Sequence, residues 1–340
     1  MARMTRVKAW TAPREGGQPS LRAFVVLTGM VCTLILGTFT LTNALQVYRH
    51  TPESLAWCSL VNLKQQAALE KGAQKILLIG GSGVSLGLNA AFLEKELERP
   101  VANFGLQASL GIEIILTEAK KVLEPGDTAL LIFEYPLFHL QETTSVAQEW
   151  LLGCGLPSLK EKSLPEQFLF FLGVNPMRWL DVLGQEEASY PEVHREMKSR
   201  FDRNGDRILD RHTWPDTSDR MQERLQLYQP ENIHLIEDAP GPAYIKEFVD
   251  WAAAQDISVL ASWPNTISFD EYQDDPRFQK IEGFYNDIDV TVIGKPELAL
   301  LDVKWFYDTQ YHLTAEGILK RTAAFNDALK NLPDAKDIIR

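Results

Sequence analysis

The chain has 340 residues, of which 45% are hydrophobic and 24% are charged, a composition typical of a globular protein. Its formal net charge of -12 argues against a nucleic-acid partner, because phosphate binding requires a concentrated basic surface. Three cysteines are too few for a disulfide scaffold. We therefore expect a globular protein with a full-sized hydrophobic core.

The N-terminal region has the pattern of a membrane anchor. Residues 23–47 contain no charged side chain, and their number matches the ~20 residues that a helix needs to cross a bilayer. The preceding tail, 1–22, is basic, so the positive-inside rule predicts a cytoplasmic N-terminus and a main domain in the periplasm or outside the cell. A cleaved signal peptide is the alternative, although its apolar region would usually be only about 7–15 residues.

One cysteine, Cys32, lies inside the apolar segment. The other two, Cys58 and Cys154, could pair in an oxidising compartment. Two unlinked thiols fit the sequence equally well, because nothing in it places these residues close together.

A βα pattern follows the anchor. Residues 48–72 favour a helical connecting stretch, and the folded domain is expected over 73–340. Unbroken apolar runs predict buried parallel strands, and the segments between them predict helices. The expected strands are 75–80, 101–105, 128–135, 257–263 and 289–294, and the expected helices are 88–98, 111–123, 242–255 and 314–332.

Residues 136–230 interrupt this pattern with scattered prolines, aromatic residues and charges, which favours a largely helical insertion. The whole pattern indicates an α/β fold with three layers, a flavodoxin-like parallel sheet with helices on both faces.

Within the insertion, the segment 202–210 places oxygen ligands at calcium-like spacing. Arg207 stands where a calcium loop needs glycine, so we favour an Asn-Gly-Asp turn and expect neither a metal nor a cofactor.

The first candidate for chemistry is Ser82, in the sequence Gly80-Gly81-Ser82-Gly83 at the end of the first strand. Ligands of open α/β sheets bind at the carboxyl ends of strands, and glycines allow a tight turn that exposes a hydroxyl beside backbone N–H groups. The alternative is an ordinary turn serine that caps a helix.

The second candidate is the pair Asp308 and His312, just before the last helix. A nucleophilic serine needs a base, and the base needs a carboxylate that holds its tautomer. Alternatively, both residues only help to start the helix.

Together the two motifs resemble the SGNH (GDSL-like) hydrolase superfamily, over about residues 75–325. The resemblance implies that Ser82 is the nucleophile, His312 the base and Asp308 the third triad member. The family spacing is Asp-x-x-His, whereas this chain has Asp-x-x-x-His. The block Asn103-Phe104-Gly105 resembles the one whose glycine N–H helps to form the oxyanion hole.

The usual Gly-x-Asn-Asp block after the third strand is replaced by Phe133-Glu134-Tyr135-Pro136. Two sets of oxyanion donors are therefore expected as alternatives: the backbone N–H groups of Ser82 and Gly105 alone, or these with Asn265, after a later strand, as a substitute for the missing asparagine. Glu134 is either a group that orients a neighbour in the pocket or a solvated strand end.

Among members of the superfamily, the order of anchor, outward domain and C-terminal Asp and His most resembles bacterial surface-polymer modification proteins, such as alginate O-acetylation and D-alanyl-lipoteichoic acid biosynthesis proteins. This resemblance implies an O-acyltransferase or esterase that acts on a polysaccharide or envelope glycan, with a multi-pass membrane acyltransferase as a partner. A non-catalytic scaffold of the same fold is the main alternative, and a small-molecule binding module is a third.

Overall fold

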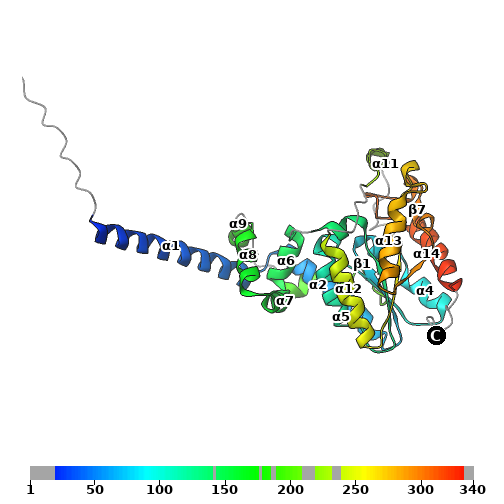
Figure 1. The fold of residues 1–340 in the computed structure, drawn as a ribbon, viewed down its shortest axis with the longest axis horizontal. Helices are drawn as coiled ribbons and strands as arrows, with labels where there is room; N and C mark the ends of the chain where they lie inside the picture. Colours follow the sequence, from blue (N-terminus) through cyan, green and yellow to red (C-terminus); the bar gives the residue numbers. More distant parts are fainter. Residues whose placement is uncertain are drawn as a thin grey trace, which may run out of the picture. The chain divides into compact units, whose positions relative to one another are not determined.

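The computed structural model describes residues 20–140, 143–175, 178–184, 189–208, 219–231 and 239–332. The chain divides into two compact units, Met1–Tyr48 and Arg49–Arg340. Helix α1 (Leu21–Tyr48) belongs to the first unit, and all other helices and strands belong to the second (Figure 1).

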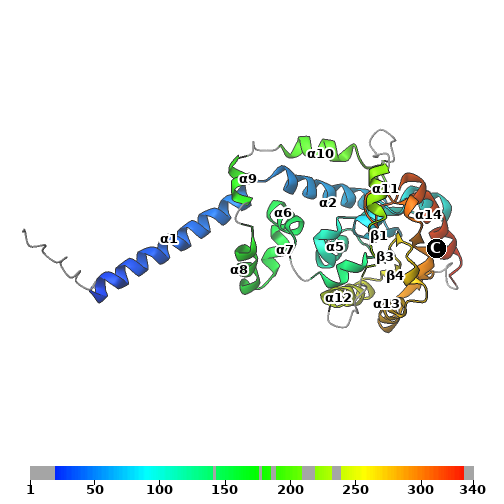
Figure 2. The same cartoon turned by 90° about the horizontal axis from the view of Figure 1, so that it is seen from above.

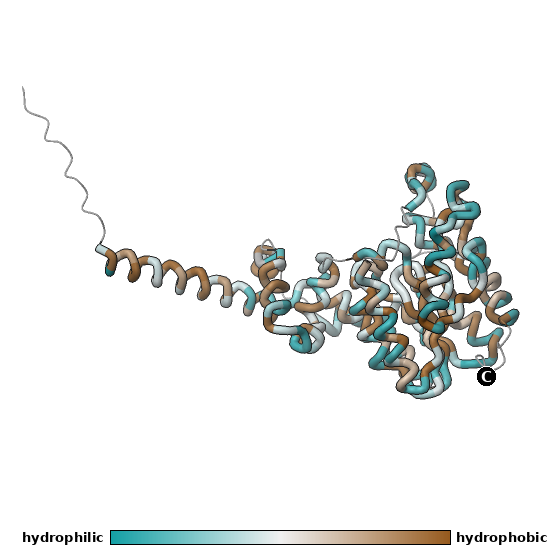
Figure 3. The backbone as a smooth tube through the Cα atoms, viewed as in Figure 1, coloured by the Kyte–Doolittle hydropathy of each residue, from teal (hydrophilic) through white to brown (hydrophobic). Residues whose placement is uncertain are grey.

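Helix α1 has 28 residues, and its most apolar window has a mean hydropathy of 2.2. Figure 3 colours most of this helix as hydrophobic or neutral, and its large apolar side chains are exposed along most of its length. By length and composition it can cross a bilayer, in agreement with the segment expected at 23–47. Most of the basic tail expected at 1–22 lies outside the described residues, and the direction in which the chain crosses remains a prediction.

The second unit is built around a parallel sheet with the strand order β2-β1-β3-β4-β6. The order of helices and strands in this unit confirms the expected α/β class. The strands of this sheet are β1 (Ile76–Gly80), β2 (Val101–Gly105), β3 (Thr128–Ile132), β4 (Ser258–Ser262) and β6 (Thr291–Ile293). Strand β3 ends three residues earlier than expected, because the chain turns at Glu134 into the short 3-10 helix η2 (Tyr135–His139).

Helices cover both faces of the sheet. Successive side chains of a strand point to opposite faces, so these buried apolar strands present an apolar surface on each side, which the helices cover. Leu77 and Ile79 of β1 belong to one core, while Ile76 and Leu78 belong to another. Figure 1 shows helices on both sides of the sheet. The first core includes α5 (Gly111–Lys120), α12 (Pro240–Ala254) and α13 (Pro276–Asp287), and the second includes α4 (Ala90–Leu97) and α14 (Ala315–Lys330).

The segment expected as a connection, 48–72, is instead part of the folded unit. It forms helix α2 (Pro52–Glu70), which begins where the Thr51 hydroxyl accepts a hydrogen bond of 3.0 Å from the Ser54 N–H. Half of its side chains are buried, and Leu60 and Val61 join the first core. The domain therefore starts near Arg49 rather than at residue 73.

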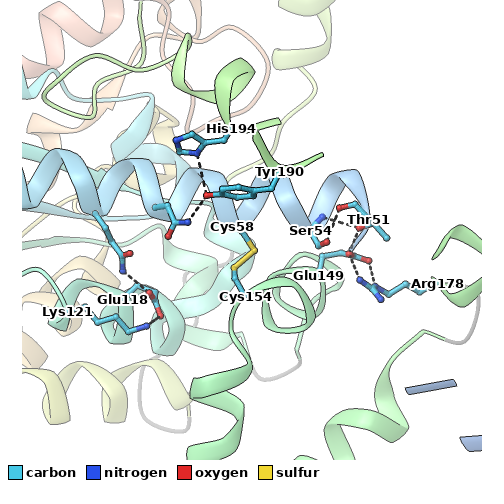
Figure 4. Close-up of a disulfide and its surroundings, with 12 residues drawn as sticks. Thr51, Ser54, Cys58, Glu118, Lys121, Glu149, Cys154, Arg178, Tyr190 and His194 are labelled. Carbon is cyan, nitrogen blue, oxygen red and sulfur yellow. Dashed lines mark hydrogen bonds and ion pairs between the residues drawn. A yellow bond between two sulfur atoms is a disulfide. The ribbon is translucent and has the colours of Figure 1, made fainter. Parts of the chain in front are cut away.

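The described parts of the insertion are largely helical, as expected. A disulfide joins Cys58 of α2 to Cys154 at the end of α6 and so ties the insertion to the sheet-bearing part of the unit (Figure 4). This result decides between the two states that the sequence left open for these cysteines. The helices are α6 (Ser145–Gly153), α7 (Leu156–Glu161), α8 (Leu164–Gly173), α9 (Arg178–Gly184), α10 (Tyr190–Lys198) and α11 (Asp219–Leu225).

Candidate functional site

Ser82 is the first residue of the short helix α3 (Ser82–Ser85), directly after β1. Its side chain is half-buried, and its hydroxyl makes no hydrogen bond to the described part of the chain. The two glycines before it are required by close contacts: a Cβ on Gly80 would lie 2.1 Å from the carbonyl oxygen of Ile132, and one on Gly81 would lie 2.8 Å from the Cα of Ala108. The Gly-rich turn thus positions Ser82 at the carboxyl edge of the sheet.

Glu134 lies directly against this turn. Its carboxylate accepts hydrogen bonds from the backbone N–H of Gly81 at 3.1 Å and of Gly83 at 2.6 Å, on either side of Ser82. The side chain is buried, and burial raises the pKa of its carboxyl group, while hydrogen bonds and the charge of His312 oppose the rise. Two roles were considered for Glu134. Its burial and its bonds to the turn of Ser82 fit a residue of the candidate site, and they do not fit a solvated strand end.

Asp308 and His312 form a pair on the loop before α14. His312 Nδ1 lies 2.8 Å from Asp308 Oδ1, the contact that a base needs to keep its proton on Nδ1. The ring of His312 also stacks on Tyr307, with ring centroids 5.8 Å apart. With Nδ1 engaged, Nε2 has no hydrogen-bond partner in the described part of the chain and is free to accept a proton.

The loop carrying His312 is attached to the helix carrying Ser82. The backbone N–H of Leu313 donates to the carbonyl of Leu86, the residue that ends α3, at 3.0 Å. Glu134 provides a second link, because it contacts the residues beside Ser82 and interacts electrostatically with His312. The structure therefore brings these residues to one edge of the sheet, without a hydrogen bond between Ser82 and His312.

Gly105 does not supply a free oxyanion donor, contrary to expectation. Its N–H donates to Asn103 Oδ1 at 2.9 Å, since the asparagine side chain folds back over its own backbone. Gly105 instead permits close packing, because a Cβ there would lie 2.2 Å from the backbone nitrogen of Ser85. At the start of α3, the remaining candidate donor is the N–H of Ser82, which lies between the two N–H groups bound by Glu134.

Asn265 is likewise not placed as an oxyanion donor. Its amide nitrogen donates at 2.5 Å to the carbonyl of Tyr311, the residue before His312. Its amide oxygen occupies the space in which a Cβ on Gly87 would stand. Asn265 therefore connects the loop that carries His312 to the segment at Gly87, which follows α3.

Three charged or phenolic side chains at this edge were not expected from the sequence. Tyr307 lies beside Asp308, and burial together with that carboxylate raises the pKa of Tyr307 to about 12. Arg207 interacts electrostatically with both Tyr307 and Asp308. Glu231 accepts hydrogen bonds from Gln310 and from the Tyr311 hydroxyl, which steadies the loop from its other side.

The segment 202–206 forms a turn, in agreement with the Asn-Gly-Asp turn expected there. Its end residues are held by a hydrogen bond of 2.9 Å from the Asp202 N–H to the Asp206 carbonyl, and Gly205 has a φ of +76°. The Asp206 carboxylate accepts hydrogen bonds from the backbone N–H groups of Ala90 and Ala91, both at 2.8 Å. Asp210, the last residue of the motif, lies outside the described residues.

A cavity of about 890 Å³ lies between α5, α12 and the insertion helices. Its wall includes Ser109, Leu140, Lys162 and Tyr244, but none of the candidate triad residues. Glu113 and Lys162, which also line it, form an ion pair of 2.6 Å. The cavity is therefore separate from the candidate site at Ser82.

No protein-family model matches the chain, and no curated protein sequence matches it. The assignment of a function therefore depends on the arrangement of the residues described above.

Proposed function

We propose that this protein is a membrane-anchored, extracytoplasmic serine esterase or O-acyltransferase of the SGNH type, acting on a cell-surface polysaccharide or envelope glycan. The observation that carries the proposal is the contact of 2.8 Å between His312 Nδ1 and Asp308 Oδ1, on a loop that is hydrogen-bonded to the helix of Ser82. A histidine whose Nδ1 is engaged by a carboxylate, and a half-buried serine with an unengaged hydroxyl on the helix to which the histidine loop is hydrogen-bonded, are the groups that acyl transfer requires.

The fold and the disulfide support the same proposal. The parallel strand order β2-β1-β3-β4-β6 corresponds to the flavodoxin-like order 2-1-3-4-5, in which ligands bind at the carboxyl ends of the strands. The bond between Cys58 and Cys154 favours an oxidising compartment, because cytosolic thiols are kept reduced. Helix α1 and the basic residues before it agree with a domain carried across the membrane.

In the proposed reaction, Ser82 Oγ attacks the acyl carbonyl while His312 Nε2 takes the serine proton, and Asp308 stabilises the imidazolium that forms. The tetrahedral intermediate expels an alkoxide, which receives that proton from His312 and leaves an acyl-Ser82. A water molecule or a sugar hydroxyl then attacks the ester, with His312 again as base, and free Ser82 is restored. A multi-pass membrane acyltransferase is the proposed partner that delivers the acyl group.

The test is covalent labelling of the full-length protein in detergent with a fluorophosphonate probe. We expect labelling of the wild type and none of Ser82→Ala or His312→Ala, while Ser109→Ala, a half-buried serine outside the site, is labelled like the wild type. Thermal unfolding of each variant would show that loss of labelling is not loss of the fold.

One observation favours the second candidate, a non-catalytic scaffold of a polysaccharide modification or export complex. Glu134 occupies the N–H groups beside Ser82 and Asn103 occupies that of Gly105, so few donors remain for an oxyanion. A folded wild-type protein that stays unlabelled with every acyl-mimicking probe would overturn the enzyme proposal in favour of the scaffold.

A further inference from the structure

Helix α8 of the insertion carries apolar side chains that are largely exposed. None of its ten residues is buried. Leu164, Phe168 and Leu172 are 79%, 54% and 54% exposed, and their spacing of four residues places them on one side of the helix. Leu169 is 64% exposed beside them. Contiguous apolar surfaces of this kind on a soluble domain mark a site of contact with a membrane or another protein.

Helix α9, the next helix along the chain, also carries exposed leucines. Leu180 and Leu183 are 43% and 50% exposed. We call these six residues the α8–α9 patch: Leu164, Phe168, Leu169, Leu172, Leu180 and Leu183.

The patch is held close to the point where the second unit begins. Thr51 Oγ1 donates to Glu149 of α6 at 2.7 Å, and the same carboxylate pairs with Arg178 of α9 through contacts of 2.6 and 3.0 Å (Figure 4). The side chain of Gln148, also in α6, donates to the carbonyl of Gly173 at the end of α8. Figure 2 shows α8 and α9 at the end of the unit where α2 begins.

Chain connectivity places that point near a membrane. Helix α1 ends at Tyr48 and α2 is capped by Thr51, so at most about 11 Å of extended chain separates the two residues. If α1 crosses a bilayer, the ion pair between Glu149 and Arg178, and the helices that it joins, cannot lie far from the lipid surface.

We infer that the α8–α9 patch inserts into the outer interface of the same bilayer that α1 spans, as an interfacial amphipathic surface. Apolar burial rather than charge drives this contact, because the exposed patch consists of leucine and phenylalanine, and Glu166 of α8 adds a negative charge. The contact holds the second unit against the membrane, which goes beyond the proposed function and does not depend on catalysis.

The test uses the full-length protein in phosphatidylcholine vesicles, with Cys32→Ser to remove the free cysteine and single cysteines labelled with an environment-sensitive fluorophore. We compare Leu169→Cys in the patch with Leu69→Cys, which is 54% exposed at the far end of α2, roughly 27 Å along the helix from its start. Leu34→Cys in α1, 71% exposed, reports on the anchor itself.

Lipids that carry a nitroxide quencher at a shallow acyl position should quench the probe at residue 169 and leave the probe at residue 69 unaffected, while lipids with the nitroxide deep in the acyl chain should quench the probe at residue 34, near the centre of α1. Quenching at 34 without quenching at 169 would overturn the inference while leaving the anchor intact. No quenching at either position would overturn both. A probe at 169 that is shielded from water in proportion to protein density, yet unquenched by lipid, would mean that a second copy of the chain covers the patch, which also overturns the inference.

Discussion

The backbone N–H of Leu313 donates a hydrogen bond of 3.0 Å to the carbonyl oxygen of Leu86. Leu86 ends the helix that starts with Ser82, and Leu313 directly follows His312. A backbone contact therefore sets the spacing between the proposed nucleophile and its base, so substitution of either side chain should leave the frame of the site in place.

Replacing Asp308 by asparagine should slow probe labelling of Ser82 by roughly 10²–10⁴-fold, because the amide can stabilise the wrong tautomer of His312 and cannot stabilise the imidazolium. Thermal unfolding should change little, since Asp308 is partly exposed. Asp302→Asn, which alters a partly exposed carboxylate in the same part of the chain, is the matched control and should label at the wild-type rate. Equal labelling rates for Asp308→Asn and Asp302→Asn would contradict a role for Asp308 as the partner of His312.

Glu134→Gln should lower the free energy of unfolding by about 1–3 kcal/mol at acidic pH, because both oxygens of a protonated carboxyl keep lone pairs that can accept from Gly81 and Gly83, whereas the amide nitrogen cannot accept and places its N–H against one of them. Burial raises the pKa of Glu134, so the folded state binds more protons than the unfolded state above the ordinary value of 4.5. Wild-type stability due to this group must then fall as pH rises through that window.

The difference in the free energy of unfolding between wild type and Glu134→Gln should accordingly become smaller as pH rises. Urea unfolding at a series of pH values measures it. Glu282→Gln, an exposed position in α13, should track the wild type at every pH. A difference that widens with pH would show that folding stabilises the charged carboxylate, and it would contradict a raised pKa for Glu134.

Gly105→Ala should destabilise the protein by about 1–3 kcal/mol, because the added methyl group meets the backbone of Ser85 at 2.2 Å and must push α3 away from β2. Gly283→Ala in α13, where a Cβ meets nothing within 4 Å, should instead stabilise by about 0.5–1 kcal/mol. Chemical denaturation of both variants checks the pair, and a neutral Gly105→Ala would contradict the tight packing of α3.

Removing the disulfide with Cys58→Ser and Cys154→Ser together should cost about 2–5 kcal/mol, because the bond closes a chain separation of 96 residues in the unfolded state. Reducing agent should lower the unfolding midpoint of the wild type and have no effect on the double variant. A wild type whose midpoint is insensitive to complete reduction would mean that the cross-link adds nothing to stability.

Strands β1, β2 and β3 were predictable because each is a mostly apolar run in which every residue is buried, and the expected bounds of β2 are those observed. The disulfide was not, since the approach of Cys58 to Cys154 depends on how α2 packs on α6, which no local pattern encodes. Segment 48–72 was predicted as a connection rather than as part of the folded domain for a similar reason. The residues that α2 buries cannot be identified without the elements on which this helix packs.

At the site, local motifs located Asp308 and His312, because their contact lies within one loop. The position of Glu134 after the third strand made it a candidate, but its bonds to Gly81 and Gly83 depend on contacts between distant segments. The same holds for the interaction of Arg207 with Asp308, which had no signal in the sequence. For Gly105 a signal did exist: Asn103 stands two residues before it, and asparagine side chains often accept an N–H at that spacing.

The turn at 202–206 has a consequence for solubility. Strand β2 is at the edge of the sheet, where unpaired backbone groups can recruit a strand from another molecule. Asn204 occupies this edge, since its carbonyl accepts the Asn103 N–H at 2.8 Å and its side chain donates to the carbonyl of Val101 at 3.1 Å. The insertion thus shields the β2 edge from intermolecular β-pairing, and a chain shortened by this loop would be prone to aggregate through β2.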